Sequence, residues 1–226
     1  MTARNILAWS PSAIVFDCDG TLMDTERHWQ EARNATFRVF GLKPPAGFVD
    51  RAKGVHYTEC GALMAHETGK PDLAGDMAAT LLSTFTALVD EDPVTIPGAA
   101  ALVQSAARHL PLAVASNCPR TMVESCLDRA GLLGYFSHVV VAGEGVRPKP
   151  EPDLYSSAVR LCGVPPTESL AVEDSLTGME SARRAGLRVI GIGPRPPGPD
   201  AEQADLWVES LADRNLVLWA RSHIGE

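Results

Sequence analysis

The sequence has little of what marks secreted, membrane or nucleic-acid-binding proteins. Its five cysteines are scattered without a C-x-x-C pair, which speaks against a disulfide framework and favours reduced thiols. No apolar run approaches the roughly 18 residues of a membrane span, and the N-terminal stretch lacks the apolar core of a signal peptide. Lys and Arg number 20 against 28 Asp and Glu, and the net charge of -8 argues against a general nucleic-acid binder. We therefore expect a cytoplasmic protein that binds neither nucleic acid nor membrane, and the sequence leaves its oligomeric state open.

Short apolar runs and longer helical patterns alternate along much of the chain. The runs are continuously apolar and rich in β-branched residues, as is typical of strands buried on both faces of a parallel sheet. The predicted strands are 12–16, 111–116, 138–143, 169–173 and 187–192, the predicted helices are 98–110, 119–132, 151–163 and 175–186, and one last strand or helix is expected within 206–220. This alternation predicts an α/β fold with a doubly wound, mainly parallel, Rossmann-like sheet.

One interval interrupts the alternation. After the first predicted strand no convincing strand follows until about residue 95, and four helical segments take its place. They are expected at 25–41, 46–54, 56–69 and 73–91. Such an interval is far longer than the roughly 2–6 residues that usually join a strand to a helix. It predicts an inserted four-helix cap domain at 25–94, on an α/β core domain made of 1–24 and 95–226.

Distinctive polar residues follow four of the predicted strands. In chain order they are Asp17 and Asp19, Ser116 and Asn117, Lys149 after a short loop, and Glu173 with Asp174. In open α/β sheets, ligands bind in the crevice outside the carboxyl ends of the strands. We therefore expect these residues to share one pocket.

The chemistry of this set is coherent. Two acidic clusters that face each other repel unless a cation lies between them, and an oxygen donor set with few protein ligands is the preference of Mg²⁺. A lysine, a hydroxyl and free backbone N–H groups can hold phosphate oxygens, and the backbone at Cys18 and Gly20 is expected to contribute. A carboxylate beside a metal and an anion site is a candidate nucleophile. The residues themselves predict a Mg²⁺ site that binds a phosphorylated ligand.

Four segments carry a resemblance to a known family. "DCDGTL", "SN", "KPEPDLY" and "VEDSLTG" resemble, in this order over residues 17 to 178, the four motifs of the haloacid dehalogenase-like superfamily. The match is with its phosphatase and β-phosphoglucomutase-like branch, which has a helical cap after the first motif. The resemblance implies a Mg²⁺-dependent phosphatase that acts on a small phosphorylated metabolite, such as a sugar phosphate, through an aspartyl-phosphate.

The resemblance also implies a role for each motif residue. Asp17 is the nucleophile, and Asp19 protonates the leaving alcohol, then activates water, while its carbonyl binds Mg²⁺. Lys149 neutralises the phosphoryl group and the nucleophile. The remaining residues bind phosphate (Ser116 and Asn117, with the backbone at Cys18 and Gly20) or complete the metal site of Asp17 and Asp19 (Asp174 and Glu173).

Each motif has a simpler structural interpretation as well. Asp17 and Asp19 could form a solvated turn, while Ser116–Asn117 and Glu173–Asp174 could cap helices. The occurrence of all four motifs in order favours the functional interpretation. In the cap, Lys53, His56 and Tyr57 are candidate substrate contacts, although a lysine at a helix end before a capping glycine explains this stretch equally.

Two alternative functions stay open. A phosphomutase of the β-phosphoglucomutase type would pass the phosphoryl group to a second sugar hydroxyl instead of water. Thr21 after the glycine, and Trp29 where a histidine is expected, favour the phosphatase. The second alternative is a catalytically silent binding module on the same fold.

Overall fold

The centre of the molecule is a parallel six-stranded sheet. The computed structural model describes residues 6–92, 94–143 and 145–224. The strands are β1 (Ala13–Phe16), β2 (Leu112–Ser116), β3 (His138–Val141), β4 (Ser169–Glu173), β5 (Arg188–Ile192) and β6 (Leu206–Val208). Their order in the sheet is β3-β2-β1-β4-β5-β6, so successive strands are added on one side of β1 and then on the other. The strand order therefore reverses between β1 and β4, which is where ligands bind in such sheets.

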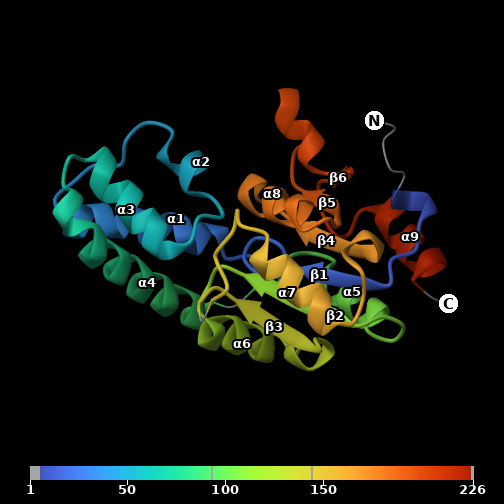
Figure 1. The fold of residues 1–226 in the computed structure, drawn as a ribbon. Helices are drawn as coiled ribbons and strands as arrows, with labels where there is room; N and C mark the ends of the chain where they lie inside the picture. Colours follow the sequence, from blue (N-terminus) through green and yellow to red (C-terminus); the bar gives the residue numbers. More distant parts are fainter. Residues whose placement is uncertain (1–5, 93, 144, 225–226) are drawn as a thin grey trace.

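Helices cover both faces of the sheet, which explains why its central strands are apolar throughout. Helices α7 (Asp153–Leu161) and α8 (Leu176–Arg184) pack on the face that Val15 joins, and α5 (Ala99–Ala106), α6 (Arg120–Arg129) and α9 (Arg214–His223) on the face of Ile14. Neighbouring residues of a strand point to opposite faces, so both sets of side chains are buried. The predicted doubly wound α/β fold is confirmed, and Figure 1 shows its layers.

Four helices fill the interval between β1 and α5. They are α1 (Glu26–Val39), α2 (Phe48–Ala52), α3 (Tyr57–Glu67) and α4 (Ala74–Glu91), called the cap helices below. Trp29 of α1 stacks on Phe85 of α4 with ring centroids 3.6 Å apart, and a Cβ at Gly61 of α3 would lie only 2.6 Å from the Ala78 nitrogen of α4. Figure 1 shows these helices gathered at one end of the molecule, away from the sheet. We propose that they form the inserted cap domain expected for residues 25–94.

Short 3-10 helices lie in several connections. They are η1 (Ile6–Ala8), η2 (Pro71–Leu73), η3 (Leu133–Tyr135), η4 (Pro166–Glu168) and η5 (Gly198–Gln203). Within the part of the chain that the structure describes, no helix has the length and hydrophobicity needed to cross a membrane.

Two details differ from the sequence-based expectation. The segment 206–220 was expected to hold one strand or one helix, and it holds both β6 and the first part of α9. The Asp213 side chain begins this helix by accepting hydrogen bonds from the Asn215 and Leu216 amides at 2.8 and 3.0 Å. Several predicted helices ran too long at their C-termini. The structure ends α6 and α7 before Gly131 and Gly163, whose φ values of 67° and 71° turn the chain out of the helix.

Candidate active site

The loop after β1 turns the chain sharply at the carboxyl end of the strands. The Asp17 amide donates to the Val172 carbonyl of β4 at 3.0 Å, and the amides of Leu22 and Met23 both donate to the Cys18 carbonyl at 2.9 Å. The Asp17 carboxylate is therefore fixed over the point where the strand order reverses.

A glycine is required within this loop. Gly20 has a φ of 84°, which disfavours other residues, and a Cβ there would overlap the Asp174 carboxylate. Its amide donates to the Met23 carbonyl at 2.7 Å, so it is not free to hold a phosphate as the sequence suggested. Across the described residues, the Cys18 and Asp19 amides have no hydrogen-bond acceptor. The loop thus offers two free N–H groups beside Asp17.

A buried lysine bridges the ends of β1 and β4. The Lys149 ammonium lies 2.6 Å from Asp17 Oδ1 and 2.5 Å from Glu173 Oε1, and the residue is only 2% exposed. It also lies over the Tyr155 ring, 5.2 Å from the centroid. One positive charge therefore serves two buried carboxylates.

This shared charge controls the protonation of the site. Burial, and then the charge of Glu173, raises the pKa of the Asp17 carboxyl, while the Lys149 ammonium acts in the opposite direction. For Lys149, burial favours the neutral form, but Asp17 and Glu173 outweigh it and raise the pKa of the ammonium. The lysine thus stays charged, and an ionised Asp17 depends on positive charge beside it.

Glu173 is held by hydrogen bonds on both of its oxygens. Oε2 accepts from the amides of Asp174 and Ser175 at 3.1 and 3.0 Å and from the Ser175 hydroxyl at 3.0 Å. Oε1 accepts from the Tyr155 hydroxyl at 3.1 Å, in addition to Lys149. These bonds let Glu173 position Lys149 and the start of α8, and its role as a metal ligand stays a prediction.

Three carboxylates come close enough to share a cation. Each of Asp17, Glu173 and Asp174 offers an oxygen within 4.8 Å of the others. Asp174 already attracts a positive group, because the Lys53 ammonium lies 2.8 Å from its Oδ2 and 2.9 Å from its carbonyl oxygen. Burial raises the pKa of Asp174 to about 6, against the opposing charge of Lys53. This all-oxygen set, in a place that already holds a cationic side chain, fits Mg²⁺.

The Asp19 carboxylate is fixed from two sides. The Thr25 hydroxyl donates to Oδ1 at 2.8 Å, and the Ser116 hydroxyl contacts Oδ2 at 3.4 Å. Ser116 is buried at the end of β2 and also accepts from the Cys118 amide at 3.0 Å. Both expected residues therefore lie together, with Asp19 between the core and the first cap helix.

Asn117 connects the core to the cap. Its Oδ1 accepts from the Lys149 amide at 2.9 Å, which helps to place that lysine. Its Nδ2 donates to the Gly54 carbonyl at 3.1 Å, in the loop between α2 and α3. Asn117, which is predicted to bind phosphate, thus also links the core to the loop between α2 and α3.

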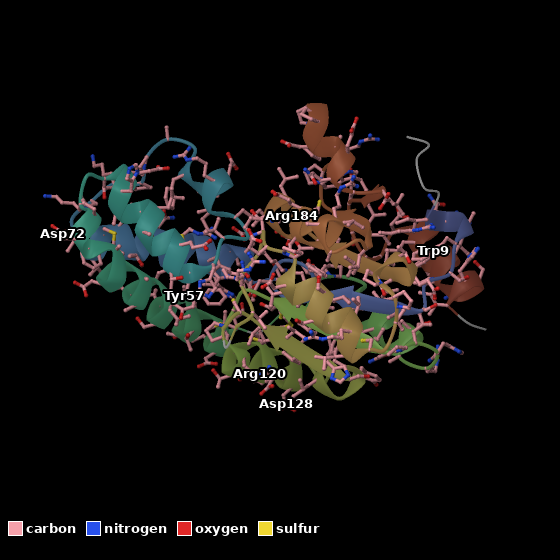
Figure 2. The ribbon with its side chains drawn as sticks, viewed as in Figure 1. Trp9, Tyr57, Asp72, Arg120, Asp128 and Arg184 are labelled. Carbon is pink, nitrogen blue, oxygen red and sulfur yellow. The ribbon has the colours of Figure 1, made fainter. Side chains whose placement is uncertain are left out.

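A cavity lies between these core residues and the cap helices. The cap contributes Glu26, Trp29, Arg33, Lys53, Gly54, Val55 and Tyr57 to its wall. In Figure 2, Tyr57 lies at the core-facing end of the cap helices and Asp72 at the opposite end. His56 is not among the lining residues. Its ring instead caps α3, where Nδ1 accepts from the Thr58 amide at 3.4 Å.

Sequence reasoning overlooked four residues of this site. Glu26 and Arg33 share one face of α1 with Trp29, and their spacing of three and four residues could have indicated this. Thr25 precedes α1 and holds Asp19, and Tyr155 lies in the "KPEPDLY" segment but was not singled out. Recognising these residues requires knowing what each helix face packs against, and the sequence does not show this.

Comparison with known proteins gives relatives over most of the chain. The family model for haloacid dehalogenase-like hydrolases matches residues 14–192. Protein CbbY of Cereibacter sphaeroides is 36% identical over 200 residues, which are 79% of this chain and 82% of that protein. The 6-phosphogluconate phosphatase of Escherichia coli (strain K12) is 30% identical over 180 residues, 79% of this chain and 80% of the relative. Validoxylamine A 7'-phosphate phosphatase of Streptomyces hygroscopicus subsp. limoneus is 29% identical over 213 residues, 93% and 97% of the two chains.

The fold also matches solved structures. A β-phosphoglucomutase from Clostridium difficile superposes with a TM-score of 0.80 over 93% of this chain and 96% of that one, at 20% identity. At this identity the likeness shows the fold alone. The predicted family and the predicted class of enzyme, a phosphoric monoester hydrolase, are confirmed by the family model and the phosphatase relatives. The chain belongs to the haloacid dehalogenase-like hydrolases.

Proposed function

We propose that the protein is a Mg²⁺-dependent phosphatase that hydrolyses a small phosphorylated metabolite through an aspartyl-phosphate on Asp17. One observation carries this proposal: the buried Asp17 carboxylate lies 2.6 Å from the Lys149 ammonium and shares a potential cation site with Asp174. A nucleophilic carboxylate and an anionic phosphoryl group repel each other, so positive charge must come between them.

The residues of the site can divide the reaction as follows. The Asp17 carboxylate attacks phosphorus while Asp19 gives a proton to the departing alcohol oxygen. Asp19 then takes a proton from water, which attacks the aspartyl-phosphate and releases phosphate. Lys149, the Ser116 hydroxyl and the free Cys18 and Asp19 amides are placed to hold the phosphoryl oxygens. Mg²⁺, when bound by Asp17, Asp174 and the Asp19 carbonyl, would neutralise charge on the phosphoryl group.

The position of the cap helices favours a small substrate. They close over the site through the contacts of Lys53 with Asp174 and of Gly54 with Asn117. Substrate entry then requires these contacts to open, and closure would keep water from the site. The phosphatase relatives act on 6-phosphogluconate and validoxylamine A 7'-phosphate, which favours a phosphorylated sugar or related polyol.

Hydrolysis of an aryl phosphate tests the proposal. We expect turnover in Mg²⁺, none after EDTA, and recovery on adding Mg²⁺ back. Asp17→Asn should lower kcat by roughly a thousandfold or more. Asp24→Asn is the matched control, because this third acid of the same stretch is half-exposed and pairs with Arg27. Metal-independent turnover, or full activity in Asp17→Asn, would overturn the proposal.

A phosphomutase is distinguished by the fate of the phosphoryl group. A phosphatase releases one inorganic phosphate for each ester consumed. A mutase supplied with a sugar bisphosphate primer would instead isomerise a sugar monophosphate without net phosphate release. We expect stoichiometric release with and without the primer.

A further inference from the structure

Arg33 carries a buried guanidinium in the wall of the cavity. Its side chain is 5% exposed, although it lies on a helix whose opposite face meets solvent. Nη1 donates to Glu26 Oε1 at 3.0 Å and Nη2 to the Ala52 carbonyl at 3.1 Å. The third nitrogen, Nε, is buried without a hydrogen-bond partner among the described residues. Because this nitrogen has almost no exposed surface, Arg33 acts through the two bonds by which it holds Glu26 and the end of α2.

Glu26 presents the complementary half of the pair. Oε1 accepts from Arg33, whereas the other oxygen has no hydrogen-bond donor in the part of the chain that the structure describes. The side chain is 31% exposed and lines the cavity next to Trp29. The cap wall therefore offers a free acceptor that Arg33 holds in place beside the Trp29 side chain.

The charges around the cavity decide what this pair can bind. Lys149 is balanced by Asp17 and Glu173, Lys53 by Asp174, and Arg33 by Glu26. A second anionic group on the substrate would be repelled by the free Glu26 oxygen, because each of these cations is already paired with a carboxylate. A hydroxyl can donate to the free Glu26 oxygen, and the Trp29 side chain that lines the cavity beside it gives the carbon skeleton an apolar contact.

We propose that Glu26, held in place by Arg33, recognises the alcohol part of the substrate and selects phosphate monoesters of uncharged, polyhydroxylated alcohols. This inference deepens the proposed function, on which it rests. Arg33 acts as a positioning residue for Glu26 and for the end of α2, because one guanidinium binds both. Glu26 is the specificity-determining contact.

Three phosphate esters of matched length test the selection. Sorbitol 6-phosphate has an uncharged polyol tail, 6-phosphogluconate adds a carboxylate, and n-hexyl phosphate has no hydroxyls. We expect kcat/KM for sorbitol 6-phosphate to exceed both others by about tenfold or more, the size of one charge-assisted hydrogen bond. In Glu26→Gln, the preference for sorbitol 6-phosphate over 6-phosphogluconate should fall at least about fivefold.

The same helix supplies a matched control. Glu31 pairs with Arg38 at 2.6 Å with the same seven-residue spacing, but both side chains are at least half exposed. Glu31→Gln should leave the preference unchanged. Arg33→Met should raise KM for the polyol ester and leave kcat for an aryl phosphate unchanged. Arg33→Lys should keep part of the preference that Arg33→Met loses. Equal preferences in the wild type, or equal effects of Glu26→Gln and Glu31→Gln, would overturn the inference.

Binding measurements separate this inference from the proposed function. In the Asp17→Asn background with Mg²⁺, calorimetry should give the same order of affinities for the three esters and the same dependence on Glu26. If that order holds while the wild type hydrolyses none of the esters, the proposed function fails and the recognition stands. If hydrolysis is confirmed but the order is absent or reversed, the recognition fails alone.

Discussion

At the scale of single residues, Lys149 is the group on which the site depends most. It is the ammonium between the buried carboxylates of Asp17 and Glu173. In Lys149→Met both carboxylates would lose their cationic partner, which we expect to cost about 4 kcal/mol in the free energy of unfolding. The pKa of Asp17 would rise further, since burial already raises it and the charge of Lys149 opposes this. We expect activity to be lost and urea unfolding to show the lower stability, whereas Arg147→Met, at an exposed position two residues away, should change neither much.

Tyr155 offers a milder test at the same scale. Its buried hydroxyl donates to Glu173 Oε1 at 3.1 Å, and Tyr155→Phe removes this one bond to a charged acceptor. We expect a loss of about 1–2 kcal/mol in the free energy of unfolding. Because Glu173 positions Lys149, kcat/KM for an aryl phosphate should also fall by roughly threefold to tenfold. The partly exposed Tyr135 provides the control, and a Tyr135→Phe variant that loses as much would contradict this role.

Side-chain alternation along β4 explains why Glu173 and Asp174, which are adjacent in the sequence, point to different surroundings. Both follow an apolar run, so each is a candidate metal ligand from the pattern alone. Glu173 is the last residue of β4 and points to the same face as Ala171, toward the layer that holds Tyr155. Asp174 lies beyond the strand and faces the cavity. The sequence identifies both acids, but only the packing of α7 separates their roles.

At the scale of elements, the loop between α2 and α3 sets how the cap meets the core. Gly54 has a φ of 72°, and a Cβ there would lie 2.5 Å from the Ser175 hydroxyl. Gly54→Ala should therefore push the Lys53–Gly54 loop off the core and lower kcat/KM by about tenfold. Gly69 has a similar φ of 68° with nothing near its missing Cβ. Gly69→Ala carries the same backbone cost, about 1 kcal/mol. Urea unfolding should therefore show lower stability in both variants, whereas kcat/KM should fall in Gly54→Ala alone.

The elements themselves were largely predictable from the sequence. Strands buried on both faces leave continuous apolar runs, and glycines such as Gly163 mark helix ends, so the order and type of the elements follow from local pattern. The partner of each helix face does not. The sequence does not show that α2 packs against Arg33, or that the His56 ring, a candidate substrate contact, caps α3.

At the scale of the whole molecule, one side chain of the cap occupies the place where a metal is proposed to bind. The Lys53 ammonium contacts both Oδ2 and the carbonyl oxygen of Asp174, so the cap helices and a cation compete for the same oxygens. In Lys53→Met the competitor and its positive charge are gone. We expect Mg²⁺ to bind this variant about tenfold more tightly in the absence of substrate, because Asp174 no longer has to release the ammonium.

Isothermal calorimetry with Mg²⁺ alone measures this competition without relying on turnover. Lys70→Met is the matched control, because Lys70 is an exposed cap lysine far along the chain from the contact with Asp174. The same Lys53→Met substitution should lower the affinity for an aryl phosphate, since the open cap would no longer be drawn to the core. Unchanged or weaker Mg²⁺ binding in Lys53→Met would mean that the cap and the cation do not share Asp174, and that closure is driven by the Asn117–Gly54 contact instead.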